Sequence, residues 1–86
     1  MIVTLPSPLI EYTNGRREVA AVGRTLNELL GDLDRQYPGI RFRMIDEQRR
    51  VRPHIKLFVD AELQCDLDAP VGHATELLIV AALSGG

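Results

Sequence analysis

The sequence has few of the features that assign a chain to a specialised class. It contains one cysteine, Cys65, among 86 residues, so no intramolecular disulfide can form and a reducing compartment is the natural setting. No stretch approaches the roughly 20 apolar residues of a membrane span. The N-terminal segment MIVTLPSPLI lacks the basic start and the long apolar run of a signal peptide. We therefore expect a cytoplasmic protein that makes no contact with a membrane.

An excess of charge of one sign is also missing. The formal net charge is −2, with 45% hydrophobic and 26% charged residues. This balance is too weakly basic for non-specific nucleic-acid binding and too apolar for disorder, so we expect neither. No repeat, low-complexity tract or linker divides the chain. The length therefore predicts a single domain, near the lower end of what one hydrophobic core can stabilise.

The clearest local pattern predicts a helix that begins after Thr25. Thr25 and Glu28 have the spacing of a capping box, in which the hydroxyl accepts from the backbone N–H three residues on and the glutamate reaches back. Apolar residues then recur along one helical stripe: Leu26, Leu29, Leu30, Leu33 and Tyr37. Asn27, Asp32, Asp34 and Arg35 lie off that stripe and are expected to face water. Pro38-Gly39 should end the helix.

Short β-branched or alternating segments predict the strands of one sheet. They cover residues 2–5, 17–22, 54–60 and 76–83, with LQCDL (63–67) as a further short strand after a tight turn at Asp60-Ala61. The first two should be antiparallel, and residues 41–53 are expected to be irregular. The order β-β-α-β-β-β favours an α+β fold with the helix packed across one face of the sheet.

The other face of such a sheet should carry exposed apolar side chains. The last strand directs Leu77 and Ile79 to one side but Leu78 and Val80 to the other, and Phe58 points away from its apolar neighbours in its own strand. Exposed patches of this kind mark partner surfaces. The alternative is a central strand whose two faces are both covered by loops.

Few other side chains suggest chemistry. Cys65 is expected to be a half-buried strand cysteine, because free cysteine usually behaves as a small hydrophobe. His54 and His73, the only histidines, should lie at the surface, and their spacing matches no zinc or catalytic pattern. We therefore expect no metal site.

Six of the ten basic residues gather in one stretch of the sequence: Arg41, Arg43, Arg49, Arg50, Arg52 and Lys56. A solvated loop would explain them, and so would a basic patch that steers an acidic partner. The sequence contains no phosphate-binding loop, so we expect any ATP to be bound by a partner and no cofactor by this chain.

The sequence ends in an apolar run followed by Ser84, Gly85 and Gly86. Glycine makes up about 7% of average composition, so a chance pair at the end has odds of about 1 in 200. Without Cβ atoms a Gly-Gly end can thread a narrow channel and presents an unhindered carboxylate. A carboxylate must be joined to a good leaving group such as AMP before a nucleophile can attack it. The end therefore suits a protein whose own C-terminus is the reacting group.

This element order, together with YTNGRREV, GRTLNELLGDLDRQYPGI, RPHIKLFVD and the tail LSGG, resembles the ubiquitin-like β-grasp sulfur carriers of the MoaD/ThiS family. The resemblance covers the whole chain. It implies a β-grasp domain over residues 1–82, with a mixed sheet of four to five strands, and a flexible tail over residues 83–86. Two departures are Asp60-Ala61 in place of an Asn-Gly turn and HATE in place of Gly-Asp-Glu before the last strand.

The resemblance also implies a function in which this chain is not itself an enzyme. A partner similar to the ubiquitin-activating E1 enzymes would use ATP to adenylate Gly86. A sulfurtransferase or cysteine desulfurase would then supply sulfur, and the Gly86 thiocarboxylate would carry it to an acceptor biosynthetic enzyme. Molybdopterin, thiamin and cysteine pathways all use such carriers, and the sequence does not choose between them.

We expect the partner to contact residues on the uncovered face and along the tail: Phe58, Val80, Leu83, Ser84 and Gly85. Other functions stay open at this point. The chain could be a ubiquitin-like modifier joined to lysines, a small non-catalytic subunit of a complex like molybdopterin synthase, or an interaction module with an inert tail.

Overall fold

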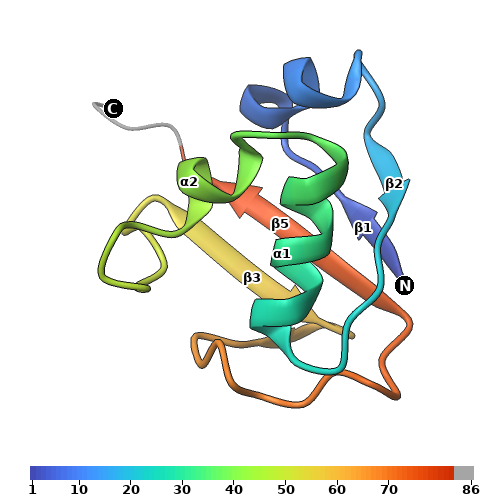
Figure 1. Ribbon diagram of the computed structural model, residues 1–86, viewed down its shortest axis with the longest axis vertical. Helices are drawn as coiled ribbons and strands as arrows, with labels where there is room; N and C mark the ends of the chain where they lie inside the picture. Colours follow the sequence, from blue (N-terminus) through green and yellow to red (C-terminus); the bar gives the residue numbers. More distant parts are fainter. Residues whose placement is uncertain (83–86) are drawn as a thin grey trace.

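Strand β5 lies at the centre of a five-stranded sheet in the computed structural model, which describes residues 1–82 (Figure 1). The elements follow in the order β1 (Ile2–Thr4), 3₁₀ helix η1 (Ser7–Thr13), β2 (Glu18–Ala20), α1 (Leu26–Gln36), α2 (Ile40–Met44), β3 (Ile55–Val59), β4 (Glu62–Leu63) and β5 (Glu76–Ala81). No helix within this part of the chain is long and apolar enough to cross a membrane.

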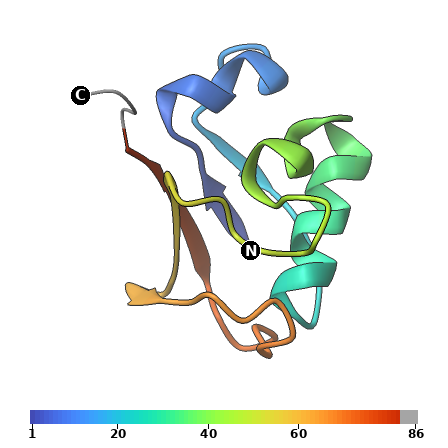
Figure 2. The same ribbon diagram turned by 90° about the vertical axis from the view of Figure 1, so that its left-hand side faces the viewer.

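The sheet is mixed, with the strand order β2-β1-β5-β3-β4. Strand β1 is antiparallel to β2, as predicted, and parallel to β5, while β3 is antiparallel to both β4 and β5. Helix α1 lies against one face of this sheet, and the opposite face carries no helix (Figure 2). The prediction of a β-grasp fold with one main helix is therefore confirmed.

Helix α1 begins at the predicted cap. The Glu28 N–H donates to the Thr25 hydroxyl over 3.1 Å, and the Glu28 carboxylate accepts from the Arg24 N–H over 3.2 Å. The four leucines of the predicted stripe, Leu26, Leu29, Leu30 and Leu33, are all fully buried. They belong to one core cluster with the inward residues of the sheet, among them Val3, Leu57, Leu77 and Ile79. The sequence periodicity therefore identified both the helix and its buried face.

Asp32 differs from its prediction, because it is buried and does not face water. Its carboxylate accepts from the Val22 N–H over 3.0 Å and from the Gln36 amide over 3.0 Å, and it pairs with Arg35. The Val22 N–H above all, then the Gln36 amide and Arg35, hold the pKa of Asp32 below its usual range against the opposing effect of burial. Asp32 thus joins the chain after β2 to the side of the helix.

Two short helices lie in stretches for which the sequence predicted no helix. Helix η1 fills the connection between β1 and β2, and α2 occupies residues 40–44. Helix α2 forms because Ile40 and Met44, four residues apart, are both fully buried. Five residues are too few to show a periodic pattern, so the sequence alone did not reveal this helix.

The segment after β3 also differs in detail. The predicted tight turn at Asp60-Ala61 is present, with φ angles of 47° and 72°. The short strand predicted after this turn is present as β4, but it covers Glu62–Leu63, so the predicted range of residues 63–67 is wrong. Cys65 lies beyond β4 and is exposed, in contrast to its predicted half-buried place in a strand.

The Asp60 side chain ties this turn to the start of β5. Its carboxylate accepts from the Glu76 N–H over 3.0 Å, from the Thr75 hydroxyl over 2.9 Å and from the Thr75 N–H over 3.0 Å. These donors, the Glu76 N–H first, hold the pKa of Asp60 below its usual range. The charged form of Asp60 is therefore part of the folded structure.

A pair of substitutions in α1 tests the core. We expect Leu29→Ala to lower the free energy of unfolding by about 2–5 kcal/mol, because Leu29 is fully buried. Gly31→Ala, in the same helix, should instead raise it by about 0.5–1 kcal/mol, since the added methyl group meets no atom within 4 Å and alanine favours helix. Urea unfolding of both variants measures the difference. Equal, small effects would mean that the leucine stripe faces water.

Acid should weaken the Asp60 junction. A carboxylate whose pKa is lowered by folding stabilises the protein above its unfolded value of about 3.9, and this contribution is lost as pH falls through the folded value. We therefore expect the melting temperature of Asp60→Asn to lie below that of the wild type at pH 7, with the difference shrinking below about pH 4. Melting curves between pH 7 and pH 2 test this. A difference that is constant with pH would contradict the assigned role.

Candidate functional site

The sheet holds the point from which the C-terminal residues depart. Strand β5 is paired on both sides, with β1 and β3, and its inward residues Leu77 and Ile79 are buried. The Ala82 N–H then donates to the His54 carbonyl over 2.8 Å. The predicted site residues Leu83, Ser84, Gly85 and Gly86 lie outside the described residues. They follow Ala82, whose backbone is held by this hydrogen bond and which we refer to as the tail root.

The outward face of the sheet carries a continuous group of apolar side chains, which we term the outer patch: Phe58, Leu63, Leu78 and Val80. The register places Leu78 opposite Phe58, and Phe58 opposite Leu63, so these three form a row across β5, β3 and β4. Leu63 is 54% exposed, Leu78 39% and Val80 38%. The prediction that the helix-free face exposes apolar side chains is confirmed, and the alternative in which loops cover both faces is wrong.

The predicted partner residues Phe58 and Val80 occupy different positions within the outer patch. Val80 is exposed and faces Lys56 across the β3–β5 pair, two residues before the tail root. Phe58 is only half-buried, because its ring lies between Leu78 and Leu63 in the row. Both therefore belong to one accessible surface, and Val80 lies nearer to the point where the tail departs.

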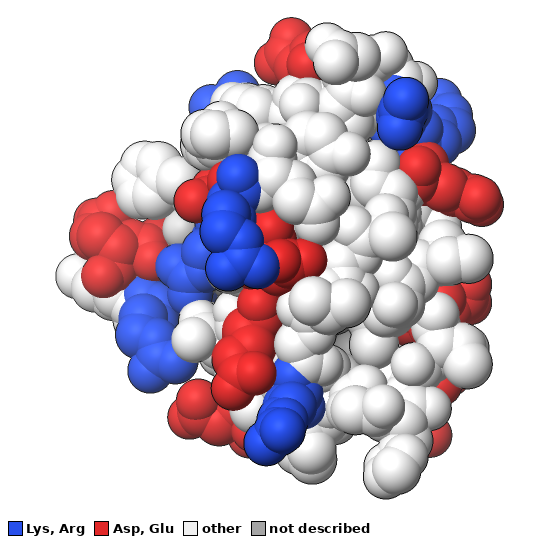
Figure 3. All heavy atoms as spheres, turned by 45° about the vertical axis from the view of Figure 1, so that its right-hand side comes forward, with Lys and Arg blue, Asp and Glu red and all other residues white. Residues whose placement is uncertain are grey.

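Charged side chains elsewhere on the molecule are mixed. On the face shown in Figure 3, basic and acidic groups alternate without a region of one sign. Within the basic stretch of the sequence, Arg49 pairs with Asp68 over 3.5 Å and Arg50 with Asp46 over 3.7 Å. These two arginines belong to a solvated loop, which is one of the two explanations that the sequence left open.

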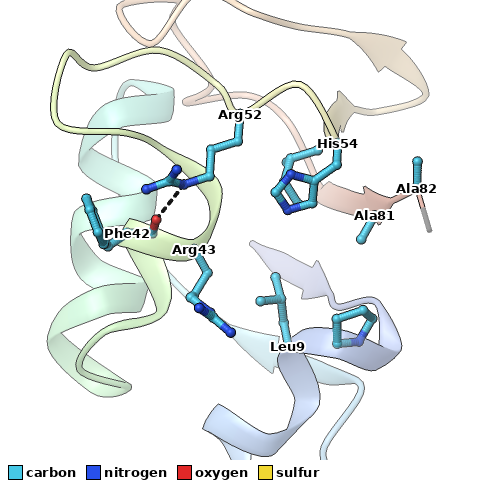
Figure 4. A pocket seen from close by; sticks show the side chains of 9 residues that line it. Leu9, Phe42, Arg43, Arg52, His54, Ala81 and Ala82 are labelled. Atoms are coloured by element: carbon cyan, nitrogen blue, oxygen red, sulfur yellow. Dashed lines mark hydrogen bonds between the residues drawn. The ribbon is translucent and has the colours of Figure 1, made fainter. Parts of the chain in front are cut away.

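Arg43 and Arg52 differ from Arg49 and Arg50, because neither forms a salt bridge within residues 1–82. Both line a groove of about 420 Å³ next to the tail root, which we term the root groove: Pro8, Leu9, Phe42, Arg43, Arg52, His54, Ile55, Ala81 and Ala82. Figure 4 shows Arg43, His54 and Leu9 around its opening, with Ala81 and Ala82 on the side where β5 ends. Sequence reasoning missed this groove because its walls come from η1, α2, β3 and β5.

The Arg52 side chain is held in place at one wall of the root groove. Its Nε donates to the Phe42 carbonyl over 2.8 Å, and its guanidinium lies 4.6 Å from the centre of the Phe42 ring (Figure 4). The Phe42 ring is itself 56% exposed. An apolar surface and positive charge are thus presented together beside the tail root.

The remaining candidate residues are not brought together. Cys65, His54 and His73 are all exposed, and they lie in different segments of the fold. Among residues 1–82 no group of three or more His, Cys, Asp or Glu side chains is arranged to hold a metal ion.

Sulfur carrier proteins are similar to this chain over almost its full length. No protein-family model matches the chain. The sulfur carrier protein CysO of Mycobacterium tuberculosis is 28% identical over 89 residues, which cover 98% of this chain and 96% of the relative. A chain in the crystal structure of the Amycolatopsis orientalis BexX/CysO complex is 30% identical, with a TM-score of 0.88 and coverage of 99% of this chain and 98% of that one.

A further similarity extends to archaeal proteins. The crystal structure of SAMP1 from Haloferax volcanii is 25% identical, with a TM-score of 0.77 and coverage of 100% of this chain and 98% of that one. The similarity of fold thus spans the whole chain in each of these cases. The relatives are small carrier or modifier proteins by name, and their length is matched almost completely.

Proposed function

Because the chain belongs to the ubiquitin-like sulfur carrier family of the MoaD/ThiS type, and is therefore a carrier protein and not a catalyst, we propose that its Gly86 carboxylate becomes a thiocarboxylate that delivers sulfur to a biosynthetic enzyme. The observation that carries this proposal is the full-length match to CysO sulfur carriers. The terminal sequence Leu-Ser-Gly-Gly supports it, since its last residue has no side chain beside the reacting carbon. The proposal requires Gly86 to be the C-terminal residue of the working carrier.

The chemistry needs two steps at one carbon atom. In the first, a Gly86 carboxylate oxygen attacks the α-phosphorus of ATP bound by an E1-like partner, and pyrophosphate leaves. In the second, sulfide sulfur attacks the acyl carbon, the bond from carbon to the AMP oxygen breaks, and AMP leaves with the electron pair. The product is the thiocarboxylate. In the cell a sulfurtransferase or cysteine desulfurase would supply the sulfur as a persulfide. Its attack on the acyl carbon would release AMP and leave an acyl disulfide, and a second thiol would reduce this to the thiocarboxylate by forming a disulfide with the donor's cysteine. ATP would be bound by the partner alone.

The fold supports this chemistry by holding one end of the tail. We propose that residues 83–86 act as a flexible arm, because they follow the last strand and include two glycines. Four extended residues reach at most about 14 Å from the tail root. The body of the carrier must therefore dock close to the partner's active site before Gly86 can enter it.

The outer patch is the surface that we propose for this docking. It places three exposed apolar side chains on the face without helices, and Val80 is only two residues from Ala82. Apolar surface of this kind is typical of partner sites. Phe58, Leu78 and Val80 would contact the activating enzyme on its surface, while Leu83, Ser84 and Gly85 would contact the channel of that enzyme that receives the tail.

A second candidate function is favoured by the similarity to SAMP1, a small archaeal modifier protein. In that case an amine would attack the activated Gly86 in place of sulfide, and an amide bond to a lysine of another protein would form. Both functions share the activation step and differ only in the nucleophile. Lys56 is the single lysine of this chain, so conjugates between copies through a lysine could form at one position only.

Intact mass spectrometry separates the two functions. The carrier is incubated with the E1-like adenylating enzyme of the same organism, ATP and a sulfide source. A mass increase equal to the exchange of one oxygen for one sulfur, lost when ATP is omitted, supports the sulfur carrier. Higher-mass conjugates with added proteins support the modifier. An unchanged mass in both cases would overturn both.

Changes at Gly85 and Gly86 test the proposed function most directly. Deleting Gly86, or adding one residue after it, should abolish sulfur transfer, because the reacting carbon is displaced and errors near 1 Å can cost about a hundredfold in rate. Gly85→Ala should slow adenylation by adding a Cβ atom inside the partner's channel. The melting temperatures of all three variants should equal that of the wild type. ATP–pyrophosphate exchange measures activation, and normal transfer by the extended variant would contradict the proposal.

The outer patch has its own test. Val80→Glu should raise the KM of the activating enzyme for the carrier at least tenfold, because a charge is brought into an apolar contact, with little change in melting temperature since Val80 is exposed. Ala20→Glu, on the same face of the sheet at edge strand β2, is the matched control and should leave KM unchanged. Equal KM values for both variants would place the docking surface elsewhere.

A further inference from the structure

We propose that the root groove binds an acidic segment of the activating partner, at the rim of the channel that receives the tail. This inference rests on the proposed function and adds a second contact surface to it. The outer patch lies on the open face of the sheet, whereas the root groove lies at the end of the sheet between η1, α2 and the start of β3. Ala82, the tail root, lines the root groove and follows Val80 of the outer patch by two residues.

The length of the tail brings the partner close to the root groove. A partner that holds Gly86 in its active site must place the mouth of its channel within about 14 Å of Ala82. Ala81 and Ala82 themselves line the groove. Groups on the channel mouth therefore lie opposite the groove whenever the tail is inserted, and those that come within the screening length of about 8 Å interact with its charges at physiological salt.

The charge of the groove selects the chemistry of its occupant. Its lining includes two guanidinium groups, Arg43 and Arg52, and the imidazole of His54, but no carboxylate. Within residues 1–82 neither arginine has an acidic partner. The protein as a whole has a net charge of −2, so this local concentration of positive charge is not a general property of the surface. Aspartate or glutamate side chains are the complementary groups on a protein partner.

The apolar walls add a second requirement. Phe42, Leu9 and Pro8 lie beside the arginines, and Arg52 covers one side of the Phe42 ring. Arginine held by a ring and a backbone carbonyl is pre-oriented for a carboxylate. The segment that fits combines carboxylates with at least one apolar side chain. A nucleotide phosphate fits less well, because the reacting α-phosphate meets Gly86 at the far end of the tail.

A charge-reversal experiment tests this surface. We expect Arg43→Glu to raise the KM of the activating enzyme for the carrier at least tenfold and to flatten its salt dependence, because an attractive contact becomes repulsive while the chemistry at Gly86 is unchanged. The rate at saturating carrier should stay at the wild-type value. Arg24→Glu carries the same change of charge on another exposed arginine, in the turn before α1, and should behave as wild type. Melting curves confirm that both variants fold.

The occupant is identified by cross-linking. The photo-reactive substitution Arg43→p-benzoylphenylalanine, used with the E1-like enzyme, should yield a cross-linked peptide of that enzyme that contains Asp or Glu. A cross-link to a second copy of the carrier, to its own tail or to a peptide without carboxylates overturns the proposal. If Arg43→Glu raises the KM for ATP and leaves the KM for the carrier unchanged, the groove binds the nucleotide and the proposal is overturned.

The two proposals fail in different ways. If the wild-type carrier is activated and Arg43→Glu is activated with the same KM, the acidic contact is excluded while the carrier function stands. If the wild type is not activated at all, both the function and the contact are excluded.

Discussion

The pairing of β5 with strands on both sides is the constraint on which the rest of the structure depends. Leu77 and Ile79 point from this strand into the core beneath the leucine stripe of α1, while Leu78 and Val80 point outward. A strand in the centre of a sheet cannot shift by one residue without exchanging these two sets of side chains. The register of β5 therefore fixes the core, the outer patch and the position of Ala82 at the same time.

This arrangement separates stability from function along the chain. The buried side chains that stabilise the fold lie between α1 and the inner face of the sheet, whereas the proposed contacts lie on the outer face and at its end. Substitutions on the outer face can therefore alter recognition at little cost in folding free energy. A small domain with one core can in this way serve several partners in succession, provided that each accepts the same tail.

The sequence predicted the features that depend on regular patterns. The Thr25–Glu28 cap, the leucine stripe, the Asp60-Ala61 turn and the exposed apolar residues of β5 all follow from spacing of 3.6 or 2 residues or from turn chemistry, and all are present. The sequence did not reveal the features that need three-dimensional contacts. Burial of Asp32 depends on the backbone N–H of Val22, ten residues away, and α2 is too short to show a period. The root groove could not be foreseen, because Leu9, Arg43, His54 and Ala81 meet only after folding.

The parallel pairing of β1 with β5 also has a mechanical consequence. Ile2 lies opposite Glu76 and Thr4 opposite Leu78, so Met1 lies where β5 begins, and Ala82 follows at the opposite end of the sheet. A force that pulls the two ends of the chain apart acts along these strands in opposite directions. It loads the hydrogen bonds between them in shear, so they must yield together and not one after another. A carrier held by its tail and drawn by its N-terminus would thus resist extension at its strongest point, the pair of strands at the centre of the fold.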